Sequence, residues 1–155
     1  MKPAKQYSDL MSDLLKELAE MSNSVDVPVG ALVIDKNLEV LAKSFNNRVK
    51  TNDPTAHAEI EAIRFAGQKL NNWRLDYCTL LVTLEPCQMC SGAILQSRIS
   101  RVVFGAFEPK TGFLVSNNSH SEKTNIEIIS GVMVEESSKI LSNWFQEKRS
   151  NKDMI

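Results

Sequence analysis

Apolar residues near the start of the chain recur every three or four positions, from Tyr7 to Met21. This spacing is typical of an amphipathic helix. Two segments rich in β-branched and apolar residues follow, from Val27 to Ile34 and from Glu39 to Ala42, and they flank the turn-forming Asp35-Lys36-Asn37. The pattern therefore predicts a helix followed by a β-hairpin.

The rest of the chain alternates helical and strand patterns. Polar residues from Asn52 to Thr55 begin a helix that Gly67 closes, and a strand from Tyr77 to Leu84 gives way to helical spacing at Cys87. The later segments are a strand from Arg101 to Gly105, a polar loop from Phe113 to Asn125, a strand from Ile126 to Ile129 and a helix between Glu135 and Arg149. We expect one layered α/β domain over residues 1–149 with some parallel pairing, and a loose tail over residues 150–155.

Composition narrows the class of protein. The chain has 155 residues, 43% hydrophobic and 24% charged, which is typical of a single globular domain and excludes a disordered protein. The net charge is −1, so any nucleic-acid site has to be a local patch. The longest apolar run, near Leu80 to Val82, is far shorter than the roughly 20 residues of a membrane span, and the N-terminus lacks a signal-peptide pattern. We expect a cytoplasmic protein without a membrane segment.

The three cysteines of the chain suggest metal chemistry, because an odd count in a reducing compartment is a poor basis for disulfides. Cys87 and Cys90 form a Cys-x-x-Cys motif, and His57 precedes Cys87 by 30 residues. One imidazole and two thiolates suit Zn²⁺, and three protein ligands leave the fourth tetrahedral position to water. The sequence thus predicts one catalytic zinc ion per chain.

The glutamate beside the histidine completes a known signature. Glu59 lies two residues beyond His57, a spacing at which helical side chains do not share a face, so we assign it to proton transfer and not to metal binding. Both ligand motifs lie at predicted helix starts, where the helix dipole stabilises thiolates. His-x-Glu followed by Pro-Cys-x-x-Cys is the signature of the zinc-dependent nucleobase deaminases.

Two other kinds of site use the same residue types. A structural zinc site needs four protein ligands, and only Cys78 or His120 could complete the set. Cys78 lies in a strand pattern typical of a small buried residue, and His120 lies in a polar loop. A thioredoxin-like redox pair leaves His57 and Glu59 unused. Both alternatives are disfavoured.

From about Val27 to Arg149 the sequence resembles the bacterial-type tRNA-specific adenosine deaminases of the cytidine deaminase superfamily. The segments that carry this resemblance are Val27-Pro28-Val29-Gly30-Ala31, Asn46, Asp53 to Glu59, Leu84 to Ala93, Ser97-Arg98-Ile99 and Arg101 to Ala106. The resemblance implies a three-layer α/β/α cytidine deaminase-like fold with a mixed five-stranded sheet, and a homodimer. It also implies hydrolytic deamination of adenosine to inosine at the wobble position of a tRNA anticodon stem-loop.

The resemblance also implies residue roles. Asn46 and Ala58 match substrate-binding positions of the family, and Glu108 stands where its members commonly carry an aspartate near the substrate ribose. Trp144-Phe145 resembles the family's terminal aromatic cluster. Helical spacing is equally consistent with Trp144 and Phe145 packing in the core or in a dimer seam. Candidate RNA contacts are Arg48, Lys50, Lys110, Phe145, Lys148 and Arg149.

Two features depart from the family pattern, namely Phe107 and the loop from Phe113 to Asn125. The serious rival within the zinc deaminases is an enzyme for a free base or nucleoside such as guanine, cytosine or cytidine. It would share the zinc site and differ in the walls of the pocket.

Overall fold

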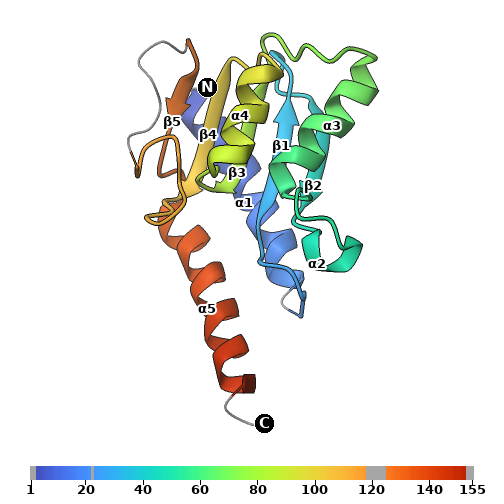
Figure 1. Ribbon diagram of the computed structural model, residues 1–155. Coiled ribbons are helices and arrows are strands. Elements are labelled where there is room, and N and C mark those ends of the chain that lie inside the picture. The colour runs from blue at the N-terminus through green and yellow to red at the C-terminus, as the bar shows by residue number, and fades with distance from the viewer. Residues whose placement is uncertain (1–2, 22, 118–124, 153–155) are drawn as a thin grey trace.

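The computed structural model describes residues 3–21, 23–117 and 125–152. Its centre is a five-stranded sheet in the order β2-β1-β3-β4-β5 (Figure 1). The strands are β1 (Gly30–Ile34), β2 (Val40–Phe45), β3 (Thr79–Leu84), β4 (Arg101–Ala106) and β5 (Glu127–Ile129). β1 is antiparallel to both of its neighbours, whereas β3, β4 and β5 are parallel. The expected mixed sheet is confirmed.

Helices cover both faces of this sheet, which confirms the three-layer α/β/α prediction (Figure 1). They are α1 (Pro3–Glu20), α2 (Arg48–Thr51), α3 (Ala58–Leu70), α4 (Gln88–Gln96) and α5 (Val134–Lys152). α3 and α4 pack on one face, and α1 and the start of α5 pack on the other. The C-terminal half of α5 projects beyond the sheet (Figure 1). Among the described helices, none has both the length and the apolar composition that a bilayer span requires.

The alternation of side chains along the central strands explains why the sheet has two cores. In β3, Leu80 and Val82 face the core under α3 and α4, whereas Leu81 faces the core under α1. Successive side chains of a strand point to opposite faces, so a strand buried on both sides reads as a continuous apolar run. All three of these side chains are fully buried.

Several boundaries differ from the sequence prediction. β1 begins at Gly30, because residues 27–29 form a tight turn in which the Val29 amide bonds to the Val27 carbonyl. β2 continues to Phe45, because Phe45 pairs with Gly30 at the start of β1. The short helix α2 was not predicted. α3 continues past Gly67 to Leu70 and is closed by Asn71, whose φ of 50° is left-handed.

The last helix is longer than predicted. α5 continues through Ser150 to Lys152, so the proposed tail does not begin at residue 150, and residues 153–155 lie outside the described residues. Residues 150–152 contain neither proline nor glycine, and the Ser150 hydroxyl donates to the Gln146 carbonyl over 3.1 Å. Arg149 and Lys152 also lie in the last turn, where positive charge complements the helix dipole.

Strand direction decides where functional groups gather. β2, β3 and β4 run the same way, because β1 is antiparallel to both β2 and β3 while β3 and β4 are parallel. Their carboxyl ends therefore lie at one edge of the sheet, together with the start of the reversed strand β1. Ligands of α/β proteins bind outside the carboxyl ends of strands. The segments that leave these strands carry Asn46, Glu85 to Cys87, and Glu108.

Candidate active site

Three metal-ligating side chains meet at this edge. His57 is the N-cap residue of α3, Cys87 is the N-cap residue of α4, and Cys90 lies in the first turn of α4. The His57 Nδ1 atom lies 3.4 Å from the Cys90 Sγ and 3.7 Å from the Cys87 Sγ. Among the described residues this is the one group of at least three histidine, cysteine or acidic side chains placed to share a metal ion.

Local hydrogen bonds explain how the chain delivers His57 to this point. The Thr55 amide and hydroxyl both donate to the Asp53 carboxylate, over 2.8 and 2.7 Å, and form a turn immediately before α3. The Ala58 amide donates to the Asn46 Oδ1 over 2.9 Å, which ties the start of α3 to the end of β2. Asn46 therefore fixes the residue that follows the histidine.

Hydrogen bonds within the cluster set the protonation of its three side chains in the absence of metal. A hydrogen bond with the Cys90 thiol is the main cause that lowers the pKa of Cys87, to about 4, and His57 adds to the effect. The same hydrogen bond, together with burial, raises the pKa of Cys90, and the bond to Cys87 raises that of His57. Zinc binds the thiolate form of cysteine and the neutral form of histidine, so metal binding at this cluster releases the protons that these hydrogen bonds hold.

The spacing of the donor atoms fits zinc. A tetrahedral zinc ion lies about 2.3 Å from sulfur and about 2.0 Å from nitrogen, so the sulfur and nitrogen atoms that bind it are about 3.5 Å apart. The two nitrogen–sulfur distances in the cluster, 3.4 and 3.7 Å, bracket that value. All three donor atoms lie within 4.8 Å of one another. The expected ligand set is therefore preassembled.

Glu59 lies beside the cluster in the first turn of α3. It is only 4% exposed, and burial raises the pKa of its carboxyl group to about 7. Its carboxyl group also contacts the Cys90 thiol. A carboxyl group whose pKa lies near neutrality exchanges a proton readily, which is the property required of a general acid and base.

A cavity of about 220 Å³ opens onto His57, Cys87 and Glu59. Asn46 and Glu108, two of the expected substrate-binding residues, line it. The third, Ala58, does not line it, because its methyl group is fully buried in the core under α3. The other residues of the wall are Val27, Val29, Arg48, Leu84, Glu85, Thr111, Leu141 and Phe145.

The sequence did not indicate a role for Glu85, which lines the cavity and fixes the backbone of the segment after β4. Its carboxylate is 2% exposed and accepts hydrogen bonds from the amides of Glu108, Val115 and Ser116, at 3.1, 2.7 and 2.8 Å, and from the Ser116 hydroxyl. Burial alone would raise its pKa, but these hydrogen bonds outweigh it and hold the pKa below the usual range. A charged residue at the end of the buried strand β3 was the signal that could have identified it.

The two neighbouring aromatic residues of α5, Trp144 and Phe145, have different surroundings. Trp144 is partly buried, and its indole nitrogen donates to the Ser24 carbonyl over 2.9 Å, which anchors α5 to the segment before β1. Phe145 is 45% exposed and lines the active-site cavity. Trp144 therefore packs against a neighbouring segment, whereas Phe145 borders the cavity and its contact with RNA stays a prediction.

The candidate RNA contacts extend from the active-site cavity to the C-terminal part of α5. Arg48 lines the active-site cavity, and Lys50 lines a second cavity beside it. Lys110 is exposed two residues after Glu108, Arg149 is exposed on α5, and the Lys148 ammonium lies 5.2 Å from the centre of the Trp144 ring. The loop prediction over residues 113–125 can be followed only in part, because residues 118–124, with His120, lie outside the described residues.

Comparison with known proteins agrees with this geometry. Residues 4–106 match the family described as the cytidine and deoxycytidylate deaminase zinc-binding region. The tRNA-specific adenosine deaminase of Haemophilus influenzae is 41% identical over 152 residues, which cover 95% of this chain and 88% of that protein.

Two solved structures extend the comparison. One comes from a study of A-to-I editing by tRNA:A34 deaminases at the wobble position. It superimposes with a TM-score of 0.76 at 38% identity, covering 84% of this chain and 97% of that one. A guanine deaminase from Bacillus subtilis is also 38% identical, but it covers only 62% of this chain and 64% of that one, with a TM-score of 0.56. The chain therefore belongs to the zinc-binding cytidine and deoxycytidylate deaminase family and, within it, to the tRNA-specific adenosine deaminases.

Proposed function

We propose that this protein deaminates adenosine to inosine at the wobble position of a tRNA anticodon, with residues 1–149 acting as one deaminase domain. The observation that carries the proposal is the extent of the similarity to a relative named tRNA-specific adenosine deaminase. It covers 95% of the chain, and therefore the segments that wall the cavity as well as the zinc signature. A guanine deaminase of 38% identity covers only 62% of this chain, and a guanine deaminase structure that covers 93% of it is only 21% identical.

In this proposal His57, Cys87 and Cys90 hold the zinc ion. When bound there, a zinc ion would lower the pKa of a bound water molecule to about 7 and so supply a nucleophile near neutral pH. Glu59 accepts the two protons of the attacking water in turn, and passes one to the purine ring nitrogen and the other to the leaving amino group. Water adds at C6 of adenine, ammonia leaves, and inosine remains.

The walls of the cavity hold the nucleoside. Asn46 is held by its bond to the Ala58 amide, so its carboxamide has a fixed orientation toward the ligand. Glu108 is held through its own amide by Glu85 and lines the same cavity, where we assign it to the ribose. Phe145 offers a ring face to an unstacked base.

An anticodon loop suits such a pocket. Its bases are outside a regular duplex, so turning one of them into a closed cavity costs less than extracting a paired base. Arg48, Lys110, Lys148 and Arg149 contact phosphates in this proposal, which the net charge of −1 permits because the contacts are local. A tRNA substrate also places the protein in the cytoplasm.

The protein binds one zinc ion per chain through its three ligands. We expect metal analysis of the purified protein to give about one equivalent, and Cys87→Ser to lose most of the metal. Cys78→Ala is the matched control: Cys78 is buried in the core and lies outside the cluster, so this variant should keep its zinc. Two equivalents of zinc, or a fully loaded Cys87→Ser protein, would contradict the ligand assignment.

Glu59 acts in proton transfer and not in metal binding. Glu59→Gln keeps the shape of the buried side chain, so zinc content and unfolding temperature should stay close to those of the natural protein. Activity should fall at least about 100-fold in kcat, because the amide cannot transfer the proton. Loss of the zinc ion in Glu59→Gln would show that the carboxylate belongs to the metal site instead.

Substrate class is tested by measuring inosine formation on an anticodon stem-loop beside turnover of free adenosine, cytidine and guanine. We expect inosine only in the stem-loop, with kcat/KM falling steeply as salt rises because phosphate contacts release counterions. Lys110→Ala should lower kcat/KM and flatten the salt dependence. Rapid turnover of a free base or nucleoside with an inert stem-loop would favour the rival enzyme class and leave the zinc chemistry intact.

We also propose a homodimer, which is supported by family membership and by Met89, an apolar side chain 37% exposed at the start of α4. Sedimentation at micromolar concentration should give a particle of about twice 17.4 kDa. Met89→Lys should shift the protein to the monomer, and Val40→Lys, a similarly exposed position on the edge strand β2, should not. A natural protein that sediments only as a monomer would exclude the dimer.

A further inference from the structure

The loop that follows β4, residues 107–117, packs against the segment between β3 and α4. The Phe113 amide donates to the Pro86 carbonyl over 3.0 Å, and Gly112 forms an isolated β-bridge with Cys87. The loop is therefore bonded directly to the segment that carries a metal ligand. It also supplies part of the wall of the catalytic cavity.

The Glu85 carboxylate bonds to both arms of this loop. Its Oε2 atom accepts the Glu108 amide over 3.1 Å and the Ser116 hydroxyl, and its Oε1 atom accepts the amides of Val115 and Ser116. Gly112 lies so close that a methyl group there would stand 2.5 Å from the Glu85 Oε2 and would also clash with the Glu108 carbonyl oxygen. Position 112 therefore requires glycine while Glu85 and the loop keep their places.

This arrangement fixes Glu108 through its main chain and through its side chain. Its amide is held by Glu85, and its own Oε1 atom accepts the Lys110 amide over 2.9 Å. Glu108 and Thr111, from the same loop, both line the catalytic cavity. The place of these two residues on the cavity wall thus depends on how Glu85 holds the loop.

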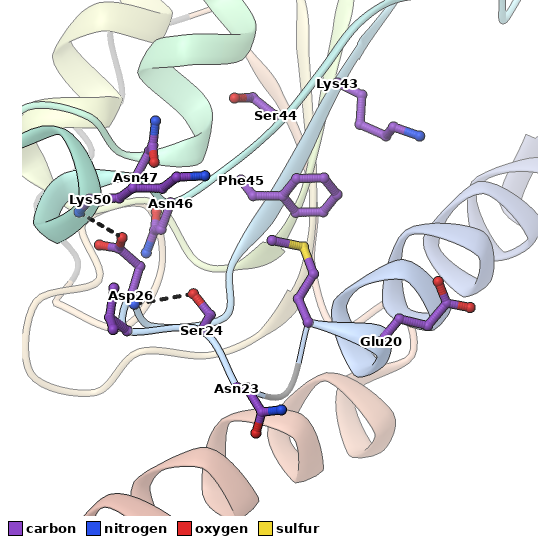
Figure 2. A pocket seen from close by; sticks show the side chains of 12 residues that line it. Glu20, Asn23, Ser24, Asp26, Lys43, Ser44, Phe45, Asn46, Asn47 and Lys50 are labelled. Carbon is purple, nitrogen blue, oxygen red and sulfur yellow. Dashed lines mark hydrogen bonds between the residues drawn. The ribbon is translucent and has the colours of Figure 1, made fainter.

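Another buried carboxylate holds a different wall of the cavity. Asp26 is 5% exposed, and its two oxygens accept the amide of Val49 at 2.8 Å and that of Lys50 at 3.3 Å, the second of which is drawn in Figure 2. Both amides belong to α2, whose first residue, Arg48, lines the catalytic cavity. Asp26 therefore makes the same kind of contact as Glu85 but holds a separate segment of the chain.

We propose that Glu85 is a positioning residue for the substrate. By holding the Glu108 amide it places the Glu108 carboxylate where that group contacts the ribose, and it thereby sets the affinity for the nucleoside. Glu85 acts through Glu108, because both of its own carboxylate oxygens are occupied by donors of the loop. The inference rests on the proposed function, in which Glu108 is assigned to the ribose.

The variant Glu85→Gln breaks this arrangement at one point. A carboxamide has one acceptor oxygen and one NH₂ donor, whereas both oxygens of Glu85 accept hydrogen bonds. If the carboxamide oxygen keeps the amides of Val115 and Ser116, the NH₂ group faces the Glu108 amide, donor against donor. The opposite orientation would break two amide bonds instead of one. The variant therefore releases the Glu108 amide selectively and keeps the size of the side chain.

Amide hydrogen exchange in the zinc-loaded protein measures this release without a substrate. In the natural protein we expect the amides of Glu108, Val115 and Ser116 to be protected. Glu85→Gln should speed exchange at Glu108 at least about 10-fold, as for loss of a hydrogen bond to a charged group. The amides of Val115 and Ser116 should stay protected, and zinc content and unfolding temperature should stay close to those of the natural protein.

Kinetics on an anticodon stem-loop measure the consequence for binding. Glu85→Gln should raise KM about 10-fold and change kcat much less, because the ribose is not a reacting group. Gly112→Ala displaces the loop without changing any charge, so it should raise KM in the same way. Asp35→Asn is the matched control and should change neither quantity. The Asp35 carboxylate also accepts two amides, but in the turn at the opposite end of the β1–β2 hairpin.

A double-mutant cycle tests whether Glu85 acts through Glu108. Once Glu108→Gln has removed the ribose contact, adding Glu85→Gln should raise KM by less than about twofold more. Asp26→Asn serves as the comparison, because it loosens α2 and not the loop. Its effect on KM should multiply with that of Glu108→Gln, as for two independent sites.

Two outcomes would overturn the inference. In the first, the natural protein forms inosine in the stem-loop, but Glu85→Gln matches it in KM and in exchange at Glu108. In the second, the effects of Glu85→Gln and Glu108→Gln on KM multiply, so that Glu85 acts independently of Glu108. If Glu85→Gln fails to fold, Gly112→Ala and its cycle with Glu108→Gln decide in the same way. An inert stem-loop with the natural protein is a different result, since it refutes the proposed function itself.

Discussion

The site depends on one topological constraint, the common direction of β2, β3 and β4. Because β1 alone is reversed among the first four strands of the sheet, three carboxyl ends and one amino end meet at a single edge. The chain then has to start α3 and α4 at that edge, where the positive ends of both helices face the thiolates. His57 and Cys87 therefore meet at this edge, although they are 30 residues apart in the sequence.

Two buried carboxylates near this edge show how the environment assigns different roles to the same side chain. For Glu59, burial dominates and raises the pKa to about 7, so a proton can come and go. For Glu85, hydrogen bonds from three amides and one hydroxyl outweigh burial and lower the pKa, so the carboxylate stays charged near neutral pH. One group suits proton transfer and the other suits a permanent structural anchor.

The sequence predicted the parts that depend on short-range patterns. The two N-cap ligands, the apolar strands and the mixed sheet follow from periodicity, the His-x-Glu and Cys-x-x-Cys motifs and the family resemblance. It did not predict α2, the role of Glu85 or the second cavity. Asp26 contacts amides 23 and 24 residues away, and Glu85 contacts amides 23 to 31 residues away. Such contacts depend on tertiary packing and leave no periodic trace in the sequence.

The hydrogen bonds between Glu85 and the loop of residues 108–116 have an evolutionary consequence. Three of its four hydrogen bonds go to main-chain amides, which are present whatever side chains occupy those positions, proline excepted. Side chains in the loop can therefore mutate while its backbone stays fixed to the end of β3. Phe107, which departs from the family pattern, lies directly before the first of these anchored amides. A change of side chain at Phe107 would leave the hydrogen bond between the Glu108 amide and Glu85 in place.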